Sequence, residues 1–123
     1  LAAYIEVIDA AVDSNPELPP IMLREVASDG THLPRVVLED MAQVVTILAG
    51  IIEDGKKRDV FTEVSPFFIH CMIMGTILMY KKAATIKDRQ PWLPAGMKNL
   101  DKKLKGSAGQ AVARLVLRAL DKQ

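Results

Sequence analysis

The chain has 123 residues, of which half are hydrophobic and a quarter are charged, and its net charge at pH 7 is +1. This composition excludes a disordered chain, and the length fits one compact domain over residues 1–123. The longest segment without Asp, Glu, Lys or Arg, from Val64 to Tyr80, is shorter than the roughly 20 apolar residues that span a bilayer, so we expect no membrane segment.

Charge is divided unevenly along the chain. Residues 1–80 carry 5 basic and 12 acidic side chains, whereas residues 81–123 carry 11 and 3. We expect the basic segment to pack near the acidic half of this chain or of a partner. A nucleic-acid patch is less favoured, because aromatic residues are not interleaved with the lysines.

The first third of the chain predicts two helices. Apolar residues recur at the helical period over residues 4–12, and Pro16 ends this helix because proline cannot extend it. A second, short helix is predicted over residues 21–27. The pair Asp29-Gly30 closes it, since glycine takes the left-handed conformation at a helix end without strain.

Residues 34–54 predict the clearest helix. Their polar side chains form one narrow stripe, so this helix must be buried on most of its circumference. The residues opposite that stripe are Met41, Val45, Leu48 and Ile52. We expect Gly55 to end the helix as its left-handed C′ residue.

A fourth helix begins at Ser65-Pro66, which supply an N-cap and a first-turn proline. Residues 67–80 are apolar all round. In so small a protein, one side of such a helix must be covered by the core and the other by something else, which we interpret as a second copy of the chain.

The last part of the chain predicts a loop and a fifth helix. Residues 87–106 combine prolines, glycines and basic side chains, which is typical of a loop. Ser107 and Gln110 have the spacing of a capping box and open a helix that runs to Leu120. The fold is therefore predicted to be all-α, with five helices.

Catalytic and metal-binding signatures are missing from the sequence. It has no GxGxxG, GxxxxGK[ST], HExxH or GxSxG motif, so we expect neither an enzyme nor a cofactor. The lone cysteine, Cys71, excludes an internal disulfide, and no Cys/His cluster suggests a metal site; a reducing, cytoplasmic location fits both. Cys71 and His70 are neighbours on a helix and point about 100° apart, so they cannot form a dyad.

The side chains of His70, Cys71 and the methionines allow more than one interpretation. We expect Cys71 to be a small buried hydrophobe. His70 is either a core histidine with a hydrogen-bond partner or a polar group in a ligand cavity. The six methionines either fill the core or line a cavity for apolar ligands, and the second interpretation is stronger for Met41 and Met74.

The fourth helix has two faces at helical spacing, one with Phe67, His70, Met74 and Leu78 and one with Phe68, Met72, Gly75 and Met79. We assign the first to a ligand cavity, because it carries a polar group able to orient a ligand. The predicted ligand-binding residues are Met41, Val45, Leu48, Phe67, His70 and Met74. The predicted dimer interface comprises Phe68, Met72, Gly75, Met79, Ala111 and Leu115.

Several segments in a fixed order carry a resemblance to a known family. They are LREVASDGTHLP at 23–34, IIEDG at 51–55, VF at 60–61, VSP at 64–66 and IHCMIMG at 69–75. Together, over residues 1–86, these segments resemble the C-terminal regulatory domain of TetR-family bacterial transcription repressors.

The resemblance implies a helical domain that binds a small effector and a homodimer joined by a four-helix bundle. The bundle helices would be Pro66–Tyr80 and Ser107–Leu120. It also implies an N-terminal helix-turn-helix domain that binds operator DNA; this sequence does not contain one, and we expect it to precede Leu1. The family fixes no universal ligand residues, so the predicted pocket depends on helix geometry alone.

Two functions follow from these expectations. The first is a ligand-responsive regulatory domain of a repressor, with a small, largely apolar effector and allosteric control of DNA binding. The alternative is a helical homodimerisation module without a ligand. A cavity between Met41 and Met74 would favour the first and a solid core there the second, while a buried nucleophilic or acidic pair facing such a cavity would indicate an enzyme.

Overall fold

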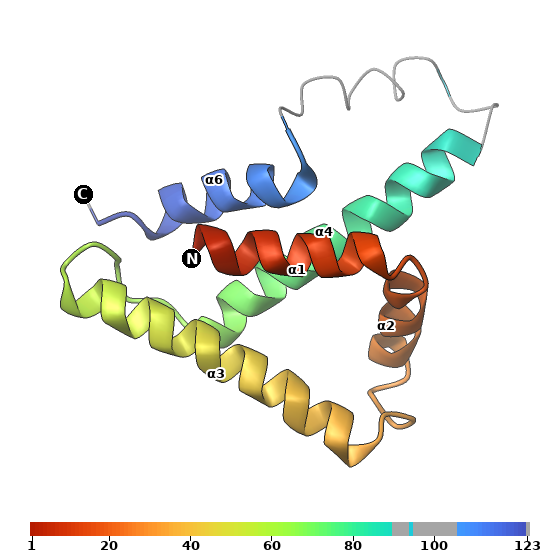
Figure 1. Cartoon of the computed structure of the whole chain (residues 1–123), viewed down its shortest axis with the longest axis horizontal. Helices are drawn as coiled ribbons and strands as arrows, with labels where there is room; N and C mark the ends of the chain where they lie inside the picture. The colour runs from red at the N-terminus through yellow and green to blue at the C-terminus, as the bar shows by residue number, and fades with distance from the viewer. Residues whose placement is uncertain (90–93, 95–105, 123) are drawn as a thin grey trace.

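The computed structural model describes residues 1–89, 94 and 106–122 (Figure 1). This part of the chain contains α1 (Ala2–Ser14), α2 (Leu18–Ala27), α3 (Arg35–Lys57), α4 (Pro66–Arg89) and α6 (Ala108–Leu120). No strand occurs among the described residues; Phe61 and Asp121 form an isolated antiparallel bridge. The prediction of an all-α fold with five helices is confirmed for these residues.

The central element is α4, which packs against each of the other four helices. Its isoleucines at 69, 73 and 77 recur every four residues and are all buried, so one side of α4 forms the middle of the core. Figure 1 shows α1 crossing α4 with α6 alongside it, while α3 extends from the lower part of α4 towards α2.

The core is formed by side chains from α1, α3, α4 and α6. Five of them are fully buried: Ile5, Leu48, Ile73, Ile77 and Leu120. Each such side chain contributes about 1.5–3 kcal/mol relative to an exposed position. The core therefore depends on contacts between helices that are far apart in the sequence.

The end of α3 differs from the prediction. The helix continues past Gly55 to Lys57, and the residue with a left-handed φ of 60° is Asp59. Gly55 is buried inside the helix, and a Cβ there would lie 2.1 Å from Cδ2 of Phe61. Glycine is required at this position because the Phe61 ring packs directly on the helix backbone, and the prediction of Gly55 as the C′ residue is wrong.

The end of α2 follows the prediction more closely. Asp29 and Gly30 both have left-handed φ values, of 59° and 70°, and the Gly30 amide donates to the Glu25 carbonyl at 2.8 Å. This is the hydrogen-bond pattern that closes a helix with a left-handed residue. The predicted helix end is confirmed, with Asp29 sharing the role that we assigned to the glycine.

Helix α4 is longer than the sequence predicted. It continues to Arg89, so residues 87–89 of the predicted loop are helical. The segment after Tyr80 contains Ala83 and Ala84 and has no proline before Pro91, so nothing interrupts the helix there. The prediction was wrong for these three residues, and most of the remaining predicted loop lies outside the described residues.

The start of α6 has the predicted capping box. The Gln110 amide donates to Oγ of Ser107, and the Ser107 amide donates to Oε1 of Gln110, both at 3.1 Å. At Gly109, α6 approaches α1 so closely that a Cβ would lie 2.6 Å from Cβ of Asp9. This glycine allows the two helices to pack with Asp9 between them.

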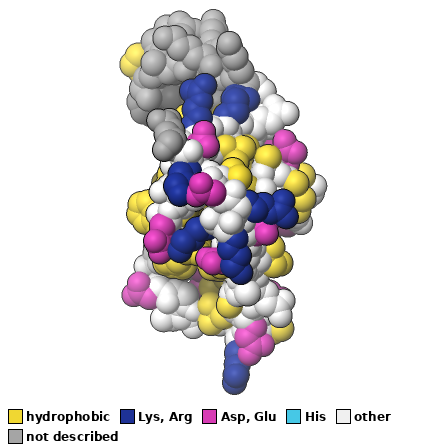
Figure 2. Space-filling view, turned by 90° about the vertical axis from the view of Figure 1, so that its left-hand side faces the viewer, with side chains coloured by type: hydrophobic (Ala, Val, Ile, Leu, Met, Phe, Trp, Pro, Cys, Tyr) yellow, Lys and Arg dark blue, Asp and Glu magenta, His cyan; other side chains and the backbone are white. Residues whose placement is uncertain are grey.

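The uneven division of charge is matched by ion pairs in the fold. Lys81 contacts Asp9 and Asp13 at 2.6 and 2.5 Å, and Lys122 contacts Asp59. Each pair joins the basic segment after residue 80 to the acidic segment before it, as the sequence predicted. On the face seen in Figure 2, basic and acidic side chains are intermingled, so that face carries no patch of one sign.

Among the described residues, every helix is too short or too polar to span a bilayer.

Candidate functional site

The outer face of α4 is the most apolar surface that the helix exposes. Phe68 is 65% exposed and Met79 is 58% exposed, and both lie on the side of the helix opposite the buried isoleucines. Met72 and Gly75 lie between them and are also exposed. The four residues recur at spacings of three and four, which places them on one face. The whole run from Val64 to Tyr80 lacks charged side chains, so this face carries no charge.

Gly75 is not needed for packing within the chain. A Cβ at this position would have no neighbour within 4 Å. A glycine in a helix interior costs about 1 kcal/mol relative to alanine, and the described fold gives no compensating contact. The open space over Gly75 would allow another helix to approach the α4 backbone closely.

The two predicted interface residues on α6 have different environments. Leu115 is 68% exposed, whereas Ala111 is half-buried. The helix buries Val112, Val116 and Leu120 against the rest of the fold. Leu115 thus adds a large exposed apolar side chain to a helix that packs directly against α4.

Cys71 does not occupy the position that the sequence predicted. Its side chain is exposed rather than buried, because residue 71 lies between Phe68 and Gly75 on the outer side of α4. The prediction of a buried cysteine is therefore wrong for the single chain.

The six predicted ligand-binding residues fall into three groups. Leu48 is fully buried in the core, and Met74 packs against that core. Met41, Val45 and His70 are half-buried. Phe67 is 64% exposed, so its side chain is more exposed than those of the other five residues. Leu48 and Met74 therefore both belong to the core region, whereas Phe67 faces solvent.

His70 has one buried nitrogen. Its Nδ1 is covered, and within the described part of the chain it has no hydrogen-bond partner. Burial lowers the pKa of the imidazole below its usual 6.5, so the ring is neutral near pH 7. A buried nitrogen without a partner is costly, and a ligand that forms a hydrogen bond with it would gain the corresponding energy.

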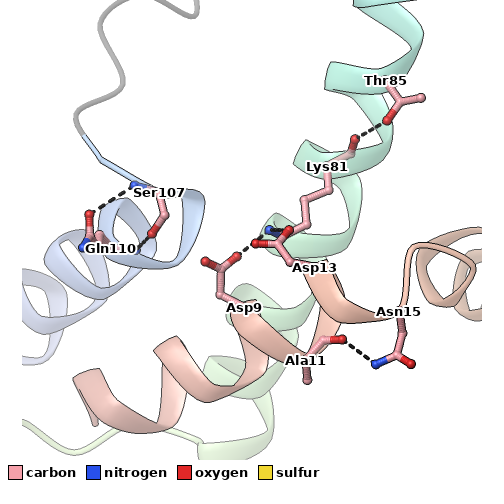
Figure 3. A network of polar contacts seen from close by, with 8 residues as sticks. All are labelled: Asp9, Ala11, Asp13, Asn15, Lys81, Thr85, Ser107 and Gln110. Atoms are coloured by element: carbon pink, nitrogen blue, oxygen red, sulfur yellow. Dashed lines mark hydrogen bonds and ion pairs between the residues drawn. The ribbon is translucent and has the colours of Figure 1, made fainter.

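A cluster of charged side chains joins α1 and α4 next to the start of α6 (Figure 3). Asp9 is only 6% exposed, and Lys81 contacts it and Asp13 together. Burial alone would lower the pKa of Lys81, but its hydrogen bonds to Asp13 and Asp9 and their charges outweigh this effect and raise that pKa. Lys81 therefore stays protonated and ties the two helices together.

The sequence patterns considered above did not identify this cluster, although α1 carries a signal for it. Asp9 is four residues after Ile5 and three before Val12, and all three are buried on one face of α1. A carboxylate at that spacing indicates a buried charge that needs a partner. Lys81, the partner, is 68 residues from Asp13 and still farther from Asp9 in the sequence, so local spacing could not identify it.

A hollow of about 620 Å³ lies away from the predicted ligand site. It is bounded by the end of α1, the start of α2, the last three turns of α4 and the start of α6. None of the six predicted ligand-binding residues lines it. Its position depends on four separate helices, which local sequence patterns do not place relative to one another.

The described residues contain no cluster of three His, Cys, Asp or Glu side chains that could hold a metal ion. The chain matches no protein-family model, no curated protein and no solved structure. The TetR resemblance therefore remains a prediction from the sequence.

Proposed function

We propose that this chain is the effector-binding and dimerisation domain of a TetR-like transcription regulator. Two copies associate through α4 and α6 into a four-helix bundle, and a small, largely apolar effector controls DNA binding allosterically. DNA is bound by an N-terminal helix-turn-helix domain that this sequence does not contain. The observation that carries the proposal is the exposed, uncharged outer face of α4.

A second copy of the chain is the partner that fits this face. Burying apolar surface contributes about 25 cal/mol per Å², and Phe68, Met72 and Met79 expose such surface along three turns of one helix. A two-fold axis brings the same residues together from both copies. Because the face has no charge, self-association causes no repulsion between like charges. The open position at Gly75 supports a close helix crossing.

The surroundings of His70 support an effector site. Its partnerless Nδ1 and the neighbouring apolar side chains, such as Met74, combine one polar group with apolar walls. Small-molecule sites commonly have this composition. An effector that binds one arrangement of the dimer better shifts the population towards it and changes the spacing of the two DNA-binding domains.

The dimer is tested with two matched substitutions, Phe68→Glu and Val36→Glu. Both replace an exposed apolar residue by a carboxylate, since Val36 on α3 is 61% exposed. Light scattering should give a mass near 13.5 kDa for Phe68→Glu and twice that value for Val36→Glu and the unchanged chain. Equal masses for the two variants would contradict the proposed interface.

A helical dimerisation module without a ligand is the second candidate function. It is favoured by the complete burial of Leu48 and the packing of Met74 against the core, which leave less room for a cavity there. Xenon distinguishes the two, because it enters apolar cavities but not close-packed cores. Xenon-dependent shifts of the Met41 and Met74 methyl resonances would support an effector site, and unchanged resonances would support the module.

A further inference from the structure

The hollow between α1, α2, α4 and α6 is separate from both sites discussed above. None of the residues of the predicted dimer interface or ligand pocket lines it. Its volume of about 620 Å³ lies within the range of small-molecule sites. The chemistry of its lining residues indicates what it binds.

Part of the lining of the hollow is apolar. It is formed by Val12, by the prolines Pro19 and Pro20 at the start of α2, and by Ala84 of α4. Proline has no backbone N–H, so the proline rings present hydrocarbon without a competing donor. This wall suits the apolar part of a ligand and offers little to a fully polar one.

Another part of the lining is cationic, and the carboxylate of Asp13, which also lines the hollow, is paired with Lys81. Lys82, Thr85 and Arg89 follow one another on α4 at spacings of three and four, and all three line the hollow. Among the described residues, neither Lys82 nor Arg89 has an ion-pair partner, whereas the charge of Lys81 is balanced by Asp9 and Asp13. Arg89 is the last residue of α4, where the helix dipole favours positive charge.

We propose that the hollow binds a small amphipathic organic anion. The hydrocarbon part lies against the proline wall, and the carboxylate lies between Lys82 and Arg89, where a guanidinium can bind two oxygens at once. The proposal goes beyond the regulatory function above, because it depends neither on the outer face of α4 nor on His70.

Three probes of equal chain length test the proposal by isothermal titration: octanoate, 1-octanol and octylammonium. We expect octanoate to bind more tightly than the alcohol, and the ammonium ion most weakly. The double variant Lys82→Gln/Arg89→Gln should weaken octanoate binding about tenfold. Arg35→Gln/Lys57→Gln is the matched control, since it removes two positive charges from the ends of α3 and should leave the affinity unchanged.

A second variant tests the cavity rather than the charge. Ala84→Phe places an aromatic ring in the hollow without altering any charge, and it should weaken octanoate binding at least tenfold while circular dichroism reports an unchanged helix content. His70→Leu should leave octanoate binding unaltered, which separates this site from the proposed effector site. Equal affinities for octanoate and octanol, or unchanged binding in either the double variant or Ala84→Phe, would overturn the proposal.

Discussion

At the scale of single residues, the buried carboxylate of Asp9 needs a cation to balance its negative charge. The carboxylate of Asp13, on the same helix, is exposed and has water to solvate it. The Lys81 ammonium supplies the cation for Asp9 from α4, and Gly109 leaves room for the Asp9 carboxylate beside α6. A buried charge whose only partner is removed is much more destabilising than the loss of an exposed pair. The two carboxylates bound by Lys81 should therefore differ in importance.

We predict that Lys81→Met lowers the free energy of unfolding by about 3 kcal/mol, because it leaves the Asp9 carboxylate buried without its cation. Asp13→Asn should lower the free energy of unfolding by less than about 1 kcal/mol, since that carboxylate is solvated. Urea denaturation followed by circular dichroism measures both changes. Equal losses for the two variants would show that burial of Asp9 is not the cause.

His70 predicts a dependence of stability on acidity. Burial holds the pKa of the folded-state imidazole below its usual 6.5, so the unfolded chain binds a proton more readily than the folded one. The stabilising contribution of His70 to the free energy of unfolding is present above pH 6.5, and it is lost as the pH falls through the lowered folded-state pKa. The fall in unfolding free energy between about pH 7 and pH 5 should be smaller in His70→Gln. Parallel curves for the two proteins would contradict this.

At the scale of elements, local patterns predicted the helices well and their ends less well. Periodicity and the prolines identified α1 and α2, and the capping box located the start of α6. Gly55 was misplaced because its role depends on the Phe61 ring, which returns to the helix after a turn. The same holds for the candidate sites. The outer face of α4 could be predicted from the sequence, whereas the hollow depends on how four helices are arranged in space.

Two glycines of α3 give a matched test of this explanation. Gly55→Ala should lower the unfolding free energy by about 1–3 kcal/mol, because the new Cβ would collide with the Phe61 ring. Gly50→Ala should raise it by up to about 1 kcal/mol, since a Cβ there meets open space and alanine favours a helix. Urea denaturation of both variants provides the comparison, and a stabilising Gly55→Ala would refute the close packing.

At the scale of the whole molecule, the outer face of α4 connects the fold to the proposed function. The other four described helices bury one side of α4 within the chain and leave Phe68, Met72 and Met79 uncovered on the other. The sequence predicted this asymmetry because residues 67–80 are apolar all round. It did not single out the isoleucines at 69, 73 and 77 as the buried side, because the whole segment is apolar.

Cys71 reports directly on whether this face is covered. Its thiol is exposed in the single chain and lies among the residues proposed to meet the second copy. We predict that its reaction with a thiol reagent slows as the protein concentration rises through the dimer dissociation constant. The Phe68→Glu variant should react rapidly at all concentrations. A rate independent of concentration in both proteins would place the contact elsewhere.

The central claim is that two copies of this chain associate, and sedimentation equilibrium of the unchanged protein at micromolar concentration tests it most directly. The account predicts a mass of twice 13.5 kDa. A mass of 13.5 kDa that persists as the concentration is raised would contradict it.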